Sequence, residues 1–103
     1  FDLIMKRIEC AGMGDMIVCL YNPKSKKRVD HIEKAANILQ RFRGADTPAG
    51  IARNIGREEE NITLTTLGKL KDADIDMFST VIIGNSQTYV HNGKMITPRG
   101  YRL

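Results

Sequence analysis

The segment "MIVCLYNPKSKKR", residues 16–28, joins a run of apolar residues to a turn rich in positive charge. Residues 16–21 form a near-continuous apolar run of strand length, and runs that are apolar on both faces are typical of strands inside an α/β sheet. The run ends at Asn22-Pro23, and residues 24–28 include four cationic side chains. The segment therefore predicts a buried strand that leads into a basic loop.

Apolar periodicity outside this segment predicts helices that alternate with strands, and later strands that follow strands. Helices are expected over residues 2–12 and 26–42, with Ser25 as the N-cap of the second helix. Strands are expected over 16–21, 49–54, 61–67 and 79–85, with a short helix around 67–71. Asn92-Gly93 lies between two alternating segments and predicts a type I′ hairpin. The order predicts a three-layer α/β domain whose mixed sheet of about five strands is flanked by helices and ends in a β-hairpin.

Length, charge and composition limit the classes of function that the chain can serve. Its 103 residues are expected to form one domain, and no apolar run reaches the roughly 20 residues of a membrane helix. The net charge of +4 is compatible with nucleic acid, phosphate or carboxylate ligands and does not choose among them. Aromatic residues make up only 6% of the chain, which does not favour a platform for single-stranded nucleic acid. The chain begins at Phe1 in a segment with helical periodicity, so we expect a piece of a longer protein.

The cysteine and histidine residues predict neither a metal site nor a disulfide framework. Cys10 and Cys19 are expected to be reduced structural residues of a cytoplasmic protein, with Cys19 buried inside the first apolar strand. His31 and His91 have no partner at metal-ligand spacing. The sequence also lacks a P-loop, a G-x-G-x-x-G motif and a persuasive Ser/His/Asp or Cys/His arrangement, so no catalytic residue is expected from motifs.

Three loops that follow predicted strands begin with asparagine, namely 22–25, 54–57 and 85–87. In open α/β sheets ligands bind beyond the carboxyl ends of strands, and asparagine both donates and accepts hydrogen bonds. These loops are therefore candidates for a ligand site, although asparagine is also a common turn former. The basic residues 24–28 can equally form a solvated face. Likewise, Arg53 and Arg57 can pair with Glu58–Glu60 instead of a ligand.

Four blocks of sequence carry a more specific signal, and they occur in a fixed order. They are "LYNPKSKKR", "TPAGIARNIGREEE" with "TLTTL", "STVIIGNSQTYV" and "MITPRGY". In these blocks the chain resembles the C-terminal half of the tetrapyrrole (corrin and porphyrin) methylases. Within that family, "YNPKSKKR", "RNIGRE" and "GNSQT" resemble the branch that methylates precorrin-3B at ring carbon 17. The resemblance covers essentially the whole chain.

The resemblance implies a cytoplasmic, two-domain methyltransferase of cobalamin biosynthesis that uses S-adenosylmethionine and releases S-adenosylhomocysteine. It implies a precorrin-type substrate, ring contraction along with methylation, a homodimer, and no nucleic-acid or membrane partner. Residues 1–103 would be the C-terminal domain, and a glycine-rich N-terminal domain, which this chain lacks, would complete the cofactor cleft. By itself the chain is expected to be inactive.

The resemblance also implies site residues. Cofactor contacts are expected at the end of the first strand, after the second strand and at the start of the fourth. These positions hold Tyr21, Asn22, Asn54, Ile55, Gly56, Ser79 and Thr80. Relatives often have methionine at the position of Asn22 and a small residue at that of Ile55, so at Ile55 only a main-chain contact is carried over. Ser79 and Thr80 can equally be strand-edge hydroxyls that bond to the backbone. The carboxylates of a precorrin are expected to bind Lys24, Arg53 and Arg57.

Two other functions are compatible with the residues. A non-enzymatic module that binds anions or nucleic acid would account for the charge of +4, and it predicts salt-dependent binding to polyanions. A dimerisation domain would account for the hairpin, and it predicts a stable dimer without any ligand. Neither alternative predicts an effect of the adenosyl cofactor, so cofactor binding separates both from the methyltransferase.

Overall fold

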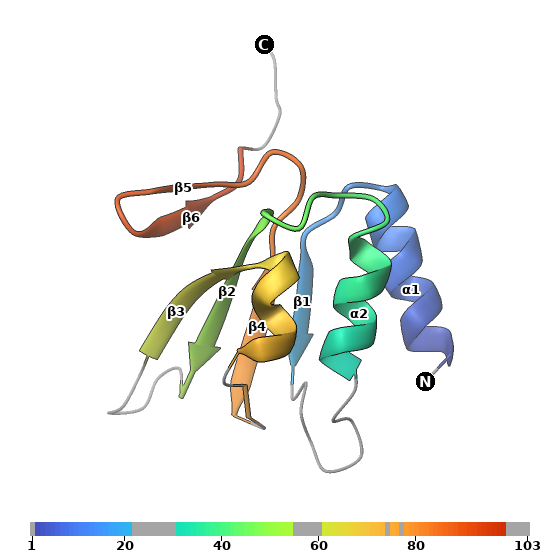
Figure 1. Cartoon of the computed structure of the whole chain (residues 1–103), viewed down its shortest axis with the longest axis horizontal. Helices are drawn as coiled ribbons and strands as arrows, with labels where there is room; N and C mark the ends of the chain where they lie inside the picture. Colours follow the sequence, from blue (N-terminus) through green and yellow to red (C-terminus); the bar gives the residue numbers. More distant parts are fainter. Residues whose placement is uncertain (1, 22–30, 55–60, 74, 77, 99–103) are drawn as a thin grey trace.

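A computed structural model describes residues 2–21, 31–54, 61–73, 75–76 and 78–98 of the chain. Within these residues, helix α1 is followed by strand β1, helix α2, strands β2 and β3, a short 3₁₀ helix η1, strand β4 and the hairpin β5–β6 (Figure 1). This order confirms the predicted α/β class and the terminal hairpin. No helix in the described part of the chain has the length and apolarity that a membrane span needs.

Helix α1 (Asp2–Met13) ends just before Gly14 and extends one residue beyond the predicted range of 2–12. The Gly14 N–H donates to the carbonyl oxygen of Cys10 at 3.0 Å, and the Met16 N–H donates to that of Ala11 at 2.9 Å. These bonds satisfy carbonyls of the last turn, which have no partner inside the helix. Asp15, in the turn that follows, has a φ of 54°, in the left-handed region.

Helix α2 (His31–Leu39) lies within the predicted range of 26–42 but ends earlier. After Leu39 the chain continues in tight turns up to Phe42. The apolar stripe predicted for this helix is buried, at Ile32, Ala35, Ala36 and Leu39. The predicted start at residue 26 and the Ser25 cap lie outside the described residues.

The main sheet has the strand order β1-β4-β2-β3, and each described pair is antiparallel. Its strands are β1 (Val18–Tyr21), β2 (Pro48–Arg53), β3 (Asn61–Thr66) and β4 (Ser79–Ile83). The prediction of a mixed sheet of about five strands is therefore wrong for the described residues. Strands β1 and β2 do run parallel to each other, as a strand–helix–strand unit requires, but β4 lies between them and is antiparallel to both.

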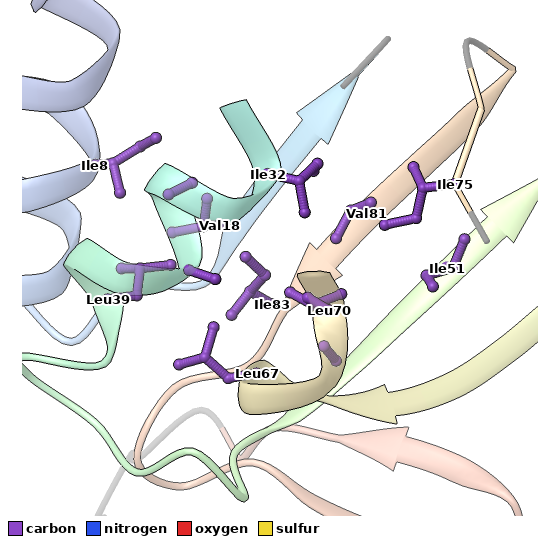
Figure 2. Packing of buried hydrophobic residues seen from close by; sticks show 13 residues of the cluster. Ile8, Val18, Ile32, Leu39, Ile51, Leu67, Leu70, Ile75, Val81 and Ile83 are labelled. Carbon is purple, nitrogen blue, oxygen red and sulfur yellow. The ribbon is translucent and has the colours of Figure 1, made fainter. Parts of the chain in front are cut away.

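The hydrophobic core lies between this sheet and one layer of helices, formed by α1, α2 and η1 (Leu67–Asp72). Figure 2 shows Ile8 from α1 and Leu39 from α2 on the same side of the sheet as Leu70 from η1. Strand β4 contributes Val81 and Ile83 to this layer, and both are fully buried. The described residues thus form two layers instead of the three predicted.

The other face of the sheet is called here the open face. The strand registers, with Val18, Leu20, Ile51, Val81 and Ile83 facing the core, place on it Cys19, Tyr21, Gly50, Ala52, Ile62, Leu64, Thr80 and Ile82. Cys19 is exposed, so the prediction that it is buried is wrong, and Cys10 on α1 is exposed as well. The apolar run 16–21 contains enough apolar residues for two buried faces, but only one of its faces is covered.

The terminal hairpin pairs β5 (Tyr89–His91) with β6 (Lys94–Ile96). Asn92 and Gly93 between them have φ values of 51° and 72°. Positive φ at both central positions is the geometry of a type I′ turn, so the predicted hairpin is confirmed. The hairpin approaches the open face at Gly50, where an added methyl group would lie 4.0 Å from the Sδ of Met95.

The Arg43 side chain connects four segments of the chain at one edge of the sheet. It is 7% exposed, and its Nη1 donates to the carbonyl oxygens of Met16 at 2.9 Å and Gly84 at 2.6 Å. Its Nη2 donates to the carbonyl oxygen of Ala11 at 3.3 Å. Burial lowers the pKa of Arg43, while the nearby Asp15 carboxylate opposes that effect. The guanidinium therefore joins the end of α1, the start of β1, the chain after α2 and the end of β4.

Candidate functional site

The antiparallel direction of β4 brings the predicted site residues of three strands to one edge of the sheet. Tyr21, at the end of β1, pairs with Thr80 of β4, and Thr80 pairs on its other side with Ala52 of β2. Arg53, at the end of β2, pairs with Ser79. The ends of β1 and β2 thus meet the start of β4, at the lower edge of the sheet in Figure 1. We call this the β1–β2 edge.

Half of the predicted contact residues lie in the part of the chain that the structure describes. Tyr21, Arg53, Asn54, Ser79 and Thr80 are described, and the structure gathers all of them at the β1–β2 edge. The remaining predicted contacts lie outside the described residues, and they are Asn22, Lys24, Ile55, Gly56 and Arg57.

The loop 85–87 lies at the opposite edge, contrary to the grouping of the three asparagine loops. Ile83, at the end of β4, pairs with Val18 at the start of β1 and with Ala49 near the start of β2, so the loop after β4 lies at the opposite edge from the ends of β1 and β2. The Asn85 side-chain amide donates to the carbonyl oxygen of Asp15 at 3.1 Å. The Ser86 N–H and hydroxyl both donate to the Asp15 carboxylate, and these bonds lower the pKa of Asp15. This loop therefore fixes the turn between α1 and β1.

On the open face, the β1–β2 edge offers small side chains beside an exposed aromatic ring. Ala52 and Thr80 are neighbours on adjacent strands, and Tyr21 flanks Thr80 on the other side. Tyr21 is 70% exposed. Ala52 is buried, so Tyr21 and the half-buried Thr80 form the part of this surface that a ligand can reach. An exposed aromatic ring can stack on a planar group such as a nucleobase, which fits the adenosine group that the resemblance implies.

Asn54 turns the chain immediately after Arg53, at the end of β2. Its φ of 55° lies in the left-handed region, which asparagine tolerates better than most residues because its side chain can bond locally. A β-branched residue at this position would oppose that geometry.

On the helix side of the edge, Asp76 organises the start of β4. Its Oδ1 accepts the Phe78 N–H at 2.9 Å and the Ser79 hydroxyl at 3.0 Å, while its own N–H donates to Ser79 Oγ at 3.1 Å. Its Oδ2 lies 3.3 Å from the Nε of Arg53 in an ion pair. Asp76 thus holds the end of β2 and the start of β4 together.

Two predicted contacts are affected by this network. Ser79 is 2% exposed and its hydroxyl is occupied by Asp76, so the geometry favours a role in holding β4 over a direct side-chain contact. Arg53 pairs with Asp76, a residue that the sequence analysis did not select. The spacing Asp-x-x-Ser is a usable signal for such a turn, because aspartate and serine side chains often bond to nearby backbone N–H groups.

A polar groove lies on the helix side, next to Arg53. Its cavity volume is about 360 Å³, and it runs between strands β2 and β3 and the helix η1. Its lining comes from Ile51, Arg53, Asn61, Thr63, Leu64, Thr65, Lys69, Asp72 and Ala73. The sequence analysis selected only Arg53 of this set.

The fold is similar to that of part of two solved methyltransferase structures. The crystal structure of the methyltransferase CobJ matches with a TM-score of 0.82 and 29% identity, over 95% of this chain and 41% of that chain. A second structure, the cobalt precorrin-4 methyltransferase CbiF, matches with a TM-score of 0.63 over 75% of this chain and 32% of that chain. Its identity of 17% supports the similarity of fold alone.

Curated relatives narrow the resemblance to one branch. The chain is 46% identical over 103 residues to a probable cobalt-factor III C(17)-methyltransferase of Salmonella typhimurium. It is 45% identical over 107 residues to the protein of the same name in Methanocaldococcus jannaschii, and 42% identical over 102 residues to the cobalt-factor III methyltransferase of Priestia megaterium. These matches confirm the resemblance to the tetrapyrrole methylases, in the branch that acts at ring carbon 17. No family model matches the chain.

The matches cover nearly all of this chain but only part of each relative. They include 100%, 97% and 99% of this chain for the Salmonella, Methanocaldococcus and Priestia proteins, respectively. They cover 43% of each of the first two relatives and 19% of the third. The chain thus spans less than half the length of these relatives.

Proposed function

We propose that this chain is part of an S-adenosylmethionine-dependent methyltransferase that methylates a precorrin-type macrocycle at ring carbon 17 during cobalamin biosynthesis. The observation that carries the proposal is the 46% identity, over all 103 residues, to a protein named as a cobalt-factor III C(17)-methyltransferase. In this proposal the protein is a cytoplasmic homodimer, and methylation is accompanied by ring contraction.

The chain's share of the cofactor site is the β1–β2 edge. In the proposed complex, the adenosine lies on the open face against Tyr21 and Thr80, and Asn22 lies at the start of the following loop. Asn54, Ile55 and Gly56 contact it through main-chain groups, while Ser79 keeps β4 in place. The ends of β1 and β2 lie on either side of the start of β4 in the described residues, which supports a shared binding surface.

Residues 1–103 act in this proposal as the C-terminal domain, and the remaining part of the protein supplies a glycine-rich domain that completes the cleft. Lys24, Arg53 and Arg57 hold carboxylates of the macrocycle through charge-assisted bonds. The bound cofactor supplies an electrophilic methyl group, so the transfer depends on alignment of the two reactants more than on a protein nucleophile. No catalytic residue is assigned to this chain.

The test is a calorimetric titration with S-adenosylhomocysteine. It compares the chain alone with the complete protein that carries it. The proposal expects tight binding to the complete protein and weak or no binding to the chain alone. An absence of binding to both would refute the methyltransferase assignment.

Two tyrosine variants locate the site within the complete protein. Tyr21→Ala removes the exposed ring at the β1–β2 edge, and its matched control, Tyr89→Ala, removes an exposed ring from the hairpin. We expect Tyr21→Ala to weaken binding about tenfold or more, in line with the loss of a stacked aromatic contact. We expect Tyr89→Ala to leave it unchanged. Equal affinities of the two variants would place the cofactor elsewhere.

A further inference from the structure

Asp76 fixes the start of β4 and the end of β2 from the helix side of the β1–β2 edge. The Ser79 hydroxyl donates to Asp76 Oδ1 and accepts the Asp76 N–H. The Ser79 N–H also donates to the Asp76 carbonyl oxygen at 3.1 Å. The second carboxylate oxygen, Oδ2, forms the ion pair with Arg53 of β2. One aspartate thus sets the spacing between the ends of two adjacent strands.

The residues that this aspartate holds stand directly before two proposed cofactor contacts. Ser79 precedes Thr80, which lies on the open face, and Arg53 precedes Asn54, whose φ of 55° turns the chain at the end of β2. Successive residues of a strand are only about 3.3 Å apart and point to opposite faces. A displacement of Ser79 or Arg53 therefore moves the neighbouring contact residue as well.

A ligand on the open face would not touch Asp76 itself. Its carboxylate interacts with Ser79, which is 2% exposed, and with Arg53, which lines the groove on the helix side. Thr80 and Tyr21 lie on the other face of the sheet. Asp76 can therefore act on such a ligand only through the strand ends that it holds.

We infer that Asp76 is a positioning residue of the adenosine site, which keeps the end of β2 and the start of β4 in the arrangement that binds the cofactor. The inference rests on the proposed function, which places the adenosine at this edge. Because the network is already formed in the described residues, ligand binding does not have to supply the cost of ordering these strand ends. The sequence motifs and the comparisons assign Asp76 no role.

The opposite edge of the sheet holds a network of the same chemical kind, which provides a control. Asp15 accepts the Ser86 N–H at 2.9 Å and the Ser86 hydroxyl, and its charge interacts with that of Arg43. This network also joins two segments, the turn before β1 and the loop after β4. Both aspartates thus stabilise local structure, but only Asp76 lies at the proposed site.

The test measures S-adenosylhomocysteine binding by calorimetry to the complete protein and to two matched variants, Asp76→Asn and Asp15→Asn. Each variant replaces a carboxylate by an amide of the same shape, and asparagine suits the φ of 54° at position 15. We expect Asp76→Asn to weaken binding about tenfold, at the lower end of the loss caused by removing outer-shell partners of metal ligands. We expect Asp15→Asn to change it by less than about twofold, because it acts at the opposite edge. Urea unfolding should show that both variants are folded, with small losses of stability of similar size.

A double-mutant cycle separates positioning from direct contact. If the Ser79 hydroxyl acts only through Asp76, Ser79→Ala should weaken binding in the wild-type protein but by less than about twofold in the Asp76→Ala background. An undiminished effect in that background would show that Ser79 contacts the ligand independently, and it would overturn the inference.

The outcomes for the inference and for the proposed function are distinguishable. If the wild-type protein binds S-adenosylhomocysteine and the two asparagine variants bind it equally well, Asp76 has a structural role alone, and the inference is overturned while the proposed function stands. Failure of the wild-type protein to bind S-adenosylhomocysteine would refute the proposed function and the inference with it.

Discussion

The substitution Arg43→Met tests whether one buried guanidinium holds the packed elements together. Methionine keeps an unbranched side chain of comparable length but removes all three hydrogen bonds to the carbonyl oxygens of Ala11, Met16 and Gly84. The Ala11 carbonyl keeps a second donor, the Met16 N–H. The main loss therefore falls on the other two acceptors.

The size of the effect follows from the bonds and their burial. Hydrogen bonds from a charged donor contribute roughly 1.5–3 kcal/mol each, and the substitution also relieves the cost of burying the charge. We therefore expect a net loss of about 3 kcal/mol in the free energy of unfolding. For a domain of this size such a loss lowers the melting temperature by on the order of 15 °C.

The assay is urea unfolding of the wild-type chain, Arg43→Met and the matched control Arg41→Met. Arg41 is largely exposed, lies 3.8 Å from the Glu9 carboxylate and is 5.4 Å from the Phe42 ring centre. Exposed contacts of this kind contribute about 1 kcal/mol or less. If the two variants lose the same small amount of stability, the Arg43 bonds do not hold the fold together and the reasoning is refuted.

Three further predictions concern local features. Asp76→Asn keeps one acceptor for the Phe78 N–H and loses the ion pair with Arg53, so we expect the free energy of unfolding, measured in urea, to fall by about 1 kcal/mol. Asp76→Ala also removes the acceptor, and we expect it to lower the free energy of unfolding by about twice as much. Because Ser86 lowers the pKa of Asp15, its bonds stabilise the fold above the ordinary aspartate pKa and are lost as the pH falls through the lowered value. Unfolding curves of wild type and Ser86→Ala should therefore differ at pH 6, begin to approach each other only below the ordinary aspartate pKa of about 4, and converge once the pH is below the lowered value. Gly93→Ala should destabilise the hairpin by about 1 kcal/mol because of the φ of 72°, measured as faster amide exchange in β5 and β6. The comparison is Gly14→Ala, at a glycine without positive φ where an added methyl group meets no atom closer than 3.4 Å.

Local patterns predicted the elements of this fold more successfully than their pairing. The run 79–85 and the Asn92-Gly93 turn specify their own conformations through nearby residues, and both were confirmed. The antiparallel insertion of β4 between β1 and β2 was missed, because alternating helices and strands do not indicate which strand enters the gap. The apolar run 16–21 did not indicate that the face carrying Cys19 is uncovered, because apolar residues also occupy exposed positions of strands.

For the candidate site too, individual residues were predicted more successfully than their arrangement in space. The motif resemblance selected Tyr21 and Thr80, which the structure places on adjacent strands. The loop 85–87 was grouped with the wrong edge, because its position depends on the direction of β4. Asp76 was not selected, since its role depends on an ion pair with Arg53, which lies far from it in the sequence.

The uncovered position of Cys19 makes the open face accessible to chemical labelling. Cys19 pairs with Ile82 on β4 and lies two residues before Tyr21 on the same strand. In a Cys10→Ser background, the rate at which a maleimide modifies this thiol would report directly on how much of the open face is shielded. Comparing the isolated chain with the complete protein would thus show how much of the open face any further part of the protein shields, and adding S-adenosylhomocysteine would show whether the shielding extends toward Tyr21. The chain carries this reporter group in its natural sequence, so the experiment needs no residue to be introduced into the sheet.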